Sequence, residues 1–335
     1  MIRGMFIAGI SLSFVFCAVN NTVGDSPKSE FPSIELSNGI IKMGLYLPDS
    51  EKGYYRGTRF DWSGVMPQVE YKGHTYFGEW KTTHDPNNND DITGPVEEFR
   101  TGSFGEPSAL GYKEAKPGEP FIKIGVGLLE KADEPNYNFG RAYKIIRPGK
   151  WDVTHGKDWI EFKQDFQGIS GWSYTYVKKI TLVKGKPEFT IFHSLKNTGT
   201  SPIETSQYNH NFFIIDNTPI GTDYVLKFPF DVKIMRDLKG SLEAKGKEVY
   251  FLKNLEGESL FSEFEGFSND PKDYDITVLN KKTGAGVRIK GDNPLAHLNF
   301  WTIKTTVCPE PFISANLSPN EKKDWKITYS FFTNP

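Results

Sequence analysis

Histidine is the side chain that proteins most often use to transfer protons near neutral pH. The sequence holds six histidines, at positions 74, 84, 155, 193, 210 and 297. They are scattered and have no cysteines at zinc-ligand spacing beside them, which argues against a zinc site. His210 is distinctive because Asn209 precedes it and two aromatic residues, Phe212 and Phe213, follow it. It is therefore a candidate for acid–base chemistry, although a lone histidine on a strand more often has a structural role.

Other chemistries find little support in the sequence. It has no Gly-rich phosphate-binding loop and no nucleophile elbow. Cys308 lies two residues before Glu310, so a strand would place both side chains on one face. Because a free cysteine usually behaves as a small apolar group, we expect Cys308 to be buried and unreactive.

An acidic loop could hold calcium. Oxygen-bearing side chains alternate along residues 85–91, as they do at the start of an EF-hand loop. An EF-hand would also need glycine at position 90 and glutamate at position 96, where this chain has Asp90 and Val96. Glu97 and Glu98 could still supply oxygens. A solvated acidic loop with no metal is the preferred interpretation, so we expect no cofactor.

Alternating apolar residues dominate the chain after residue 30, which predicts strands rather than helices. In the segment 189–195 even His193 shares the face of the apolar side chains. Strands are expected at 159–166, 172–183, 189–195 and 325–332, with a hairpin that joins 275–279 to 286–289 through a turn at 281–284. No stretch of twelve residues has helical periodicity. We therefore predict an all-β, mostly antiparallel fold with two large sheets packed face to face. Residues 79–118 and 131–140 are expected to form long polar loops.

Composition and charge narrow the possible functions. The chain has 335 residues, 14% of them aromatic, and 40 basic residues nearly balance 42 acidic ones. A net charge of −2 argues against nucleic acid as a partner, because phosphate binding needs a concentrated basic surface. No shift in composition separates two domains, so residues 25–335 are expected to form one domain.

The first residues have the pattern of a secretory leader. Arg3 precedes the apolar run 5–19, and polar residues follow it. The run is short for a bilayer-spanning helix, so we expect a signal peptide over residues 1–24, no membrane span in the mature chain, and a secreted or periplasmic protein. A retained anchor is one alternative. A lipoprotein anchored at Cys17 is another, although Phe16 occupies a position that usually holds a small residue.

Four segments of the C-terminal half carry a resemblance to a known family. They are the strand end Leu195–Pro202, the segment Tyr208–Phe213 with its Asn-His pair, Val307–Pro311 around Glu310, and the turn Leu317–Glu321 before Trp325. In this order they resemble the galactose mutarotase-like superfamily, specifically the aldose 1-epimerases and hexose-phosphate mutarotases. The resemblance covers about residues 175–335. Asn320 stands where the family usually has glycine, and asparagine also adopts left-handed turns.

The resemblance implies a supersandwich of antiparallel strands with an open sugar-binding cleft, and a sugar or oligosaccharide as partner. By position, Glu310 matches the family's general base and His210 its general acid. Exchange of sugar anomers needs such a pair, because the anomeric hydroxyl loses a proton while the ring oxygen gains one. No cofactor is required for this chemistry.

The N-terminal half departs from the family, which usually has an Asn-Arg pair and a second histidine there. Arg59 could supply a guanidinium for hydroxyl or phosphate contacts, and His84 could be the second histidine, although its flanking residues differ. Asn209 and Trp62 are further candidates for substrate binding, and Trp80 could offer a flat face to a sugar ring. A surface ion pair, a loop hydrogen bond and core packing are the alternatives for these residues.

The resemblance leaves three functions open. The first is an aldose 1-epimerase-like isomerase, the second is a carbohydrate-binding protein that uses the same cleft without catalysis, and the third is a sandwich from a polysaccharide lyase or hydrolase. If the chain is exported, free sugars or glycan fragments are better substrates than cytoplasmic hexose phosphates.

Overall fold

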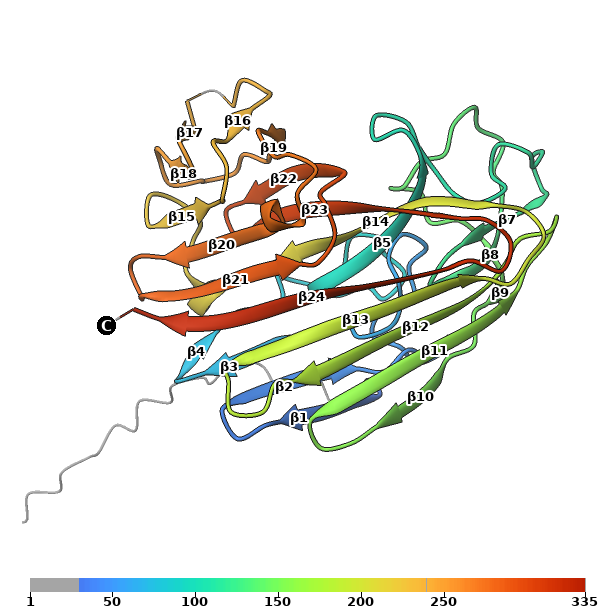
Figure 1. The fold of residues 1–335 in the computed structure, drawn as a ribbon, viewed down its shortest axis with the longest axis horizontal. Coiled ribbons are helices and arrows are strands. Elements are labelled where there is room, and N and C mark those ends of the chain that lie inside the picture. Colours follow the sequence, from blue (N-terminus) through green and yellow to red (C-terminus); the bar gives the residue numbers. More distant parts are fainter. Residues whose placement is uncertain (1–29, 239, 335) are drawn as a thin grey trace, which may run out of the picture.

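The computed structural model describes residues 30–238 and 240–334, which form antiparallel strands joined by turns and loops (Figure 1). The predicted signal peptide at 1–24 and Cys17 lie outside the described residues. Within the described part of the chain, no helix has the length and apolar character needed to cross a membrane. The two helical segments are short 3₁₀ turns, η1 (Ile215–Asn217) and η2 (Pro271–Asp273).

The larger of the two main sheets has ten strands and is formed mostly by the middle and the C-terminal part of the chain. In spatial order its strands are β10 (Asp152–His155), β11 (Trp159–Gln167), β12 (Ser173–Leu182), β13 (Glu188–Asn197), β24 (Lys322–Thr333), β21 (Ala285–Gly291), β20 (Asp275–Asn280), β15 (Tyr224–Lys227), β18 (Glu248–Phe251) and β17 (Leu242–Lys245).

The second main sheet has seven strands and lies behind the first in the view of Figure 1. In spatial order its strands are β16 (Lys233–Ile234), β19 (Leu260–Glu265), β22 (His297–Ile303), β23 (Thr306–Leu317), β14 (Ile203–Phe212), β5 (Gly94–Gly102) and β6 (Pro107–Ser108). Two smaller sheets complete the fold. The first contains β1 (Ser33–Ser37), β2 (Ile41–Tyr46), β3 (Gln68–Tyr71) and β4 (His74–Thr75), and the second contains β7 (Pro120–Lys123), β8 (Gly127–Glu130) and β9 (Ile145–Pro148).

The main hydrophobic core lies between the two large sheets. Phe99 of β5 packs edge-on against Tyr176 of β12, with ring centroids 5.1 Å apart, and against Trp325 of β24 at 6.3 Å. All three side chains are buried, and one continuous cluster of apolar residues surrounds them. The face of the seven-stranded sheet that points away from this core is thereby left to form a separate surface.

The structure confirms the all-β prediction and the main strands. The expected segments 159–166, 172–183, 189–195 and 325–332 correspond to β11, β12, β13 and β24, and β20 and β21 form the expected hairpin. Along β12, side chains are alternately buried and half-buried, as the period of two requires. The polar loop expected at 131–140 is also present.

The prediction of one continuous loop over residues 79–118 is wrong. Residues 94–102 of that segment form β5, which lies between β14 and the edge strand β6 in the seven-stranded sheet. The segment lacks the usual alternation because the neighbouring residues Glu97 and Glu98 are both buried, each paired with cationic side chains on its own face of the sheet. Tertiary ion pairs thus compensate for a weak strand pattern.

Candidate active site

The face of the seven-stranded sheet that points away from the core carries most of the candidate residues. On β14, residues 208, 210 and 212 lie on this face and residues 207, 209 and 211 lie on the core face, because side chains alternate along a strand. The strand register places Glu98 of β5 beside Tyr208 of β14, and Glu310 of β23 beside Asn299 of β22. Residues distant in sequence therefore meet on one surface.

This surface forms the floor of a cavity of about 490 Å³, within the size range of small-molecule sites. Its lining combines aromatic, cationic and acidic side chains. They are Arg59, Trp80, Asp90, Glu98, Arg100, Phe104, Phe139, Tyr208, His210, Phe212, Arg236, Ser259, Phe261, Glu263, Asn299, Trp301 and Glu310, together with Gly105 and Pro107. Four of the residues named from sequence, His210, Glu310, Arg59 and Trp80, are brought together here.

His210 and Glu310 face each other across adjacent strands. His210 Nε2 lies 3.2 Å from Glu310 Oε1, and each side chain is only 6% exposed. Burial raises the pKa of Glu310 to about 7, against the lowering effect of Arg59 and Arg100. Burial, assisted by Arg59, holds the pKa of His210 well below its usual range. Near neutral pH the pair therefore holds at most one proton, and that proton is exchangeable between the two groups.

The surroundings of His210 fix its ring. The imidazole stacks on Phe212, with ring centroids 4.0 Å apart, and Phe60 packs edge-on against it at 5.8 Å. Its Nδ1 atom is buried and has no hydrogen-bond partner among the described residues. Glu310, which also accepts a hydrogen bond from Asn299, lies within a strand and is not the solvated carboxylate of a strand end. The pair is thus held rigidly by packing, with capacity for further hydrogen bonds.

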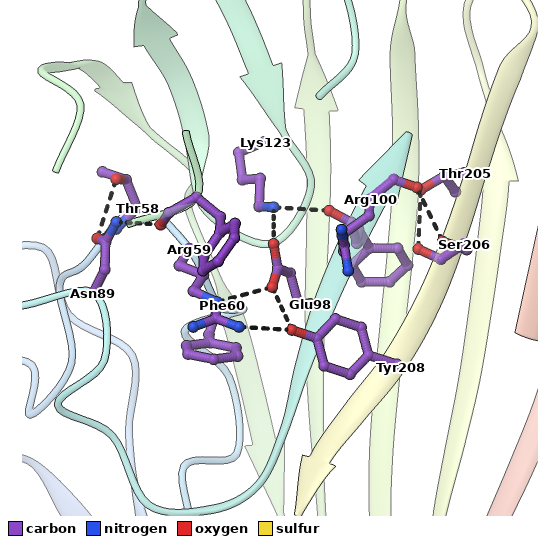
Figure 2. A network of polar contacts seen from close by, with 12 residues as sticks. Thr58, Arg59, Phe60, Asn89, Glu98, Arg100, Lys123, Thr205, Ser206 and Tyr208 are labelled. Atoms are coloured by element: carbon purple, nitrogen blue, oxygen red, sulfur yellow. Dashed lines mark hydrogen bonds and ion pairs between the residues drawn. The ribbon is translucent and has the colours of Figure 1, made fainter. Parts of the chain in front are cut away.

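A network of charged groups also reaches the cavity wall, and Figure 2 shows Arg59, Glu98, Lys123 and Tyr208 within it. Arg59 Nε donates to Glu98 Oε2 at 3.0 Å, and its Nη1 donates to Asp90 Oδ1 at 2.5 Å. Tyr208 donates its hydroxyl hydrogen to Glu98 Oε2 at 2.5 Å and accepts from Arg59 Nη2 at 3.0 Å. Lys123, fully buried, donates to Glu98 Oε1 at 2.8 Å.

The network keeps its carboxylate ionised. Burial alone would raise the pKa of Glu98, but Lys123 and Arg59 outweigh it and hold that pKa well below its usual range. The Arg59 guanidinium also lies 4.5 Å from the ring centroids of both Phe60 and Phe139. Arg59 is therefore fixed at the cavity wall, and its charge is shared with Glu98.

Aromatic rings form another wall of the cavity. Trp80 stacks against Phe212, with centroids 5.5 Å apart, and meets Trp301 edge-on at 5.6 Å. Trp80 Nε1 donates to the Ile92 carbonyl at 2.9 Å, which fixes the orientation of the indole. Flat, rigid faces of this kind suit the apolar side of a sugar ring.

The remaining predicted residues lie outside the cavity lining. His84 bonds to Asp91 at 3.0 Å and to the Tyr54 carbonyl at 2.9 Å. Asn209 points to the core side of β14, where its Nδ2 donates to Glu97 Oε1 at 3.0 Å. Trp62 is 2% exposed and donates to the Gly57 carbonyl at 2.7 Å. The side chains of His84, Asn209 and Trp62 are thus engaged in bonds away from the cavity lining.

The acidic side chains Asp90 and Asp91 of the loop considered for calcium have partners within the protein. Asp90 is paired with Arg59, and Asp91 with His84. Glu97 and Glu98 point to opposite faces of β5, so they cannot converge on one ion. Across residues 30–238 and 240–334, no group of three or more His, Cys, Asp or Glu side chains is arranged to hold a metal ion. Cys308 is fully buried as expected, and burial raises the pKa of its thiol.

Sequence reasoning missed several residues of the cavity. Tyr208 lies two positions before His210, so the period of a strand could have placed it on the same face. Glu98 and Arg100 belong to the segment that was expected to be a loop, and their role depends on the unforeseen strand β5. Trp301 and Phe139 carry no local signal, because only the tertiary fold brings them to the cavity.

Comparisons with known proteins place the fold. No protein-family model matches the chain, and no curated protein matches its sequence. Among solved structures, Slr1438 of Synechocystis sp. PCC 6803 is similar, with a TM-score of 0.58 and 13% identity over 97% of this chain and 100% of that one. A galactose mutarotase-like protein of Lactobacillus casei ATCC 334 gives 0.53 and 13% over 90% and 100% of the two chains. A GalM/aldose epimerase homologue of C. elegans gives 0.51 and 11% over 91% and 100%. These likenesses identify the architecture of this chain as the galactose mutarotase-like β-sandwich fold.

Proposed function

We propose that the protein is an aldose 1-epimerase-like enzyme that interconverts the anomers of a sugar in this cavity. The observation that carries the proposal is the buried His210–Glu310 pair, with 3.2 Å between Nε2 and Oε1, on the floor of a cavity walled by tryptophan and phenylalanine. A carboxylate and an imidazole at this separation can transfer protons at two neighbouring oxygens of one sugar ring. The similarity to structures described as galactose mutarotase-like and aldose epimerase homologues supports the proposal at the level of fold.

The reaction follows from the two groups. The Glu310 carboxylate accepts the proton of the anomeric hydroxyl, and the C1–O5 bond breaks as C1 becomes an aldehyde carbon. The His210 imidazolium gives its proton to O5, which becomes a hydroxyl. Rotation about the C1–C2 bond then presents the other face of the aldehyde to O5. Ring closure returns one proton to His210 and one from Glu310 to O1, so the enzyme ends unchanged.

The reactive state of the pair contains one proton. With the proton on Glu310 the pair is neutral, and with the proton on His210 it is the ion pair that the reaction uses. These two forms interconvert by transfer across the 3.2 Å contact. Because both groups titrate together, the pH dependence of the rate reports the pair and not either residue alone.

Binding is assigned to the walls of the cavity. Trp80 and Trp301 offer faces and edges for the apolar side of the ring, and Arg59 and Tyr208 offer donors for its hydroxyl groups. A binding protein without catalysis would use the same walls. The two functions differ only in whether the His210–Glu310 pair catalyses anomer exchange of the bound sugar.

The test is anomer exchange measured by magnetisation-transfer NMR on a panel of aldoses. Wild type should accelerate exchange above the buffer rate, and Glu310→Gln should lower kcat by about 100-fold or more, because general acid–base catalysis contributes this much. Glu204→Gln is the matched control, since Glu204 is an exposed residue on the neighbouring strand outside the cavity. Equal rates for wild type and Glu310→Gln would refute the proposal. Saturable sugar binding with no acceleration for any aldose would assign the cavity to binding alone.

We also propose that the protein acts outside the cytoplasm, on free sugars or glycan fragments. The proposal rests on the leader pattern at residues 1–24, with Arg3 before the apolar run. Fractionation of cells that express the full chain, followed by N-terminal sequencing of the product, tests it. An intact N-terminus in the cytoplasmic fraction would contradict it.

A further inference from the structure

Arg100 is an exception among the cationic side chains that line the cavity. Within the described residues it forms no ion pair, and the hydrogen bond found for its guanidinium runs from Nη2 to the Phe104 carbonyl at 3.3 Å. The guanidinium lies 5.6 Å from the ring centroid of Phe312, and the residue is half-buried. Because arginine has five N–H donors in a planar fork, most of its capacity remains unused.

The other two lining arginines have carboxylate partners. Arg59 is paired with Glu98 and Asp90, and Arg236 donates to both oxygens of Glu263, at 2.8 and 3.0 Å. The charge of Glu98 is shared further with buried Lys123. Arg59 and Lys123 together balance Glu98 and Asp90, and Arg236 balances Glu263.

Beside these balanced groups the cavity holds two further ionisable features, Arg100 and the His210–Glu310 pair. In its reactive one-proton state the pair has no net charge, so Arg100 is then the one surplus cation of the cavity wall described here. It acts at a distance on the pair, since it lowers the pKa of Glu310. A surplus guanidinium that faces a binding cavity favours an anionic group on the ligand.

We propose that the sugar bound in this cavity is a uronic acid, or a glycan that ends in one, and that Arg100 pairs with its carboxylate. The inference rests on the proposed function, because it assumes that the sugar ring lies over His210 and Glu310. A planar carboxylate matches the guanidinium fork with two parallel hydrogen bonds. A phosphate dianion would need more positive charge than one surplus arginine provides.

The register of the paired strands places the carboxylate of the bound uronic acid relative to Glu310. Arg100 pairs with Ser206, which pairs with Ser314, four residues along β23 from Glu310. With about 4.8 Å between strands and about 3.3 Å per residue, the Cα atoms of Arg100 and Glu310 are about 16 Å apart. The Arg100 guanidinium lies near the ring of Phe312, which is two residues from Glu310 on the same face of β23, so it reaches across β14 toward the pair and leaves room for one sugar ring. The anomeric carbon then lies at Glu310 and the C5 carboxylate at Arg100.

The experiment compares matched sugars that differ only at C6. Anomer exchange is measured by NMR for galacturonate against galactose and for glucuronate against glucose, with wild type, Arg100→Gln and Arg100→Lys. Wild type should have a kcat/KM at least tenfold higher for each uronate than for its hexose. Arg100→Gln should reduce uronate turnover by roughly 10- to 100-fold, the range for loss of a hydrogen-bonded charge, and reduce hexose turnover much less. Arg100→Lys should be intermediate, because it keeps the charge and loses the fork.

A control variant separates this effect from general destabilisation. Arg147→Gln removes an exposed arginine that packs on Phe166 outside the cavity, and it should leave both sugars unaffected. Circular dichroism of all variants verifies that they are folded. Equal kcat/KM for uronates and hexoses in wild type, or equal losses for both in Arg100→Gln, would overturn the inference. A stronger preference for galactose 6-phosphate than for galacturonate would overturn it as well.

Binding separates this inference from the proposed function. If no sugar shows accelerated exchange, the epimerase proposal fails, and titration calorimetry with galacturonate and galactose decides the present one. Tighter binding of galacturonate that is lost in Arg100→Gln would support a uronate-binding cavity. Equal affinity for the two sugars, or no binding of either, would refute it.

Discussion

Removal of the buried Lys178 ammonium should be among the most destabilising single changes in this protein. The side chain lies between the two main sheets and is fully buried. Its Nζ donates to Glu97 Oε2 and, at 2.6 Å, to the Ser63 carbonyl, and it lies 3.8 Å from Asp61 Oδ2. His193 Nε2, 3.0 Å from Glu97 Oε1, completes the cluster. In Lys178→Met, Glu97 keeps His193 as a partner, whereas Asp61 loses its nearest cation.

Two effects determine the loss of stability in Lys178→Met, and the first is the protonation of Asp61. Burial already raises the pKa of this group from 3.8 to about 6 while Lys178 lowers it, so without Lys178 the folded protein should keep Asp61 protonated at pH 7. Because the pKa of Asp61 is already about 6 in the folded wild type, keeping this group protonated at pH 7 adds at most about 1.4 kcal/mol to the loss, at about 1.4 kcal/mol per pH unit, and at pH 5 it adds almost nothing. The rest of the loss comes from Glu97 and the Ser63 carbonyl, which lose a buried cationic donor. Loss of one partner of a buried ion pair costs about 3–5 kcal/mol in general, so we expect about 3–4 kcal/mol at pH 7.

The sign of the pH dependence is specific to this mechanism. A carboxyl whose folded pKa is raised above its unfolded value destabilises the fold most at high pH, and the penalty shrinks as the pH falls toward 3.8. The loss of stability in Lys178→Met relative to wild type should therefore be about 1 kcal/mol smaller at pH 5 than at pH 7. An ordinary packing defect would cost the same at both pH values.

Urea unfolding followed by tryptophan fluorescence, at pH 7 and pH 5, measures both values. Lys179→Met is the matched control, because the neighbouring Lys179 is 37% exposed, forms an ion pair with Glu161 and lies over the ring of Trp159 at the protein surface. It should change the free energy of unfolding by less than about 1 kcal/mol, as expected for a surface pair. A loss below about 1 kcal/mol for Lys178→Met, or a loss independent of pH, would refute the electrostatic account.

Three further predictions concern the cavity and its surroundings. The kcat/KM for anomer exchange should fall as the pH rises above 7, because the His210–Glu310 pair loses its last proton near the raised pKa of Glu310, about 7. A pH–rate profile that rises above pH 7 would contradict a reactive pair that contains one proton. Trp80→Ala should raise KM about threefold or more through loss of an aromatic contact, with little change in kcat, as steady-state kinetics would show. His84→Ala should lower the free energy of unfolding by about 1–3 kcal/mol through its lost bonds to Asp91 and Tyr54, and thermal unfolding beside KM would separate this from substrate binding.

Strands were predicted from the sequence where apolar and polar residues alternate regularly, and were missed where they do not. Segments with a clean period of two, such as β12 and β24, were predicted as strands with nearly correct bounds. β5 was missed because its side chains read Pro-Val-Glu-Glu-Phe-Arg, which resembles neither a half-buried strand nor a buried apolar one. Its burial depends on Lys123, Lys178 and Arg59, which lie elsewhere in the sequence, so no local signal could reveal it.

The residues of the candidate site were also identified only where the sequence carried a clear signal. His210 and Glu310 were identified because their segments resemble a known family, and the structure brings the two side chains within 3.2 Å. Arg59 was identified as a possible ligand contact from its residue type, and it lines the cavity. Asn209 follows the opposite face of β14 for a reason visible in the sequence, since it is one residue from His210 on a strand. The alternation of side chains along a strand places His210 in the cavity, and for the same reason it places the adjacent Asn209 outside the cavity.

The two adjacent glutamates of β5 show why a substitution can affect the stability of the core without affecting the charges of the cavity, and the reverse. Glu97 faces the core and joins the sheets through Lys178 and His193, whereas Glu98 faces the cavity and is held by Lys123 and Arg59. A strand gives neighbouring residues opposite surroundings, so one dipeptide contributes to two charge clusters on the two sides of a single sheet. Changes at Glu97 should therefore act mainly on the free energy of unfolding, and changes at Glu98 mainly on the ligand through Arg59 and Tyr208. Because the clusters are separated by the sheet itself, the surplus charge of Arg100 remains directed to the ligand and is not neutralised by the acidic groups of the core.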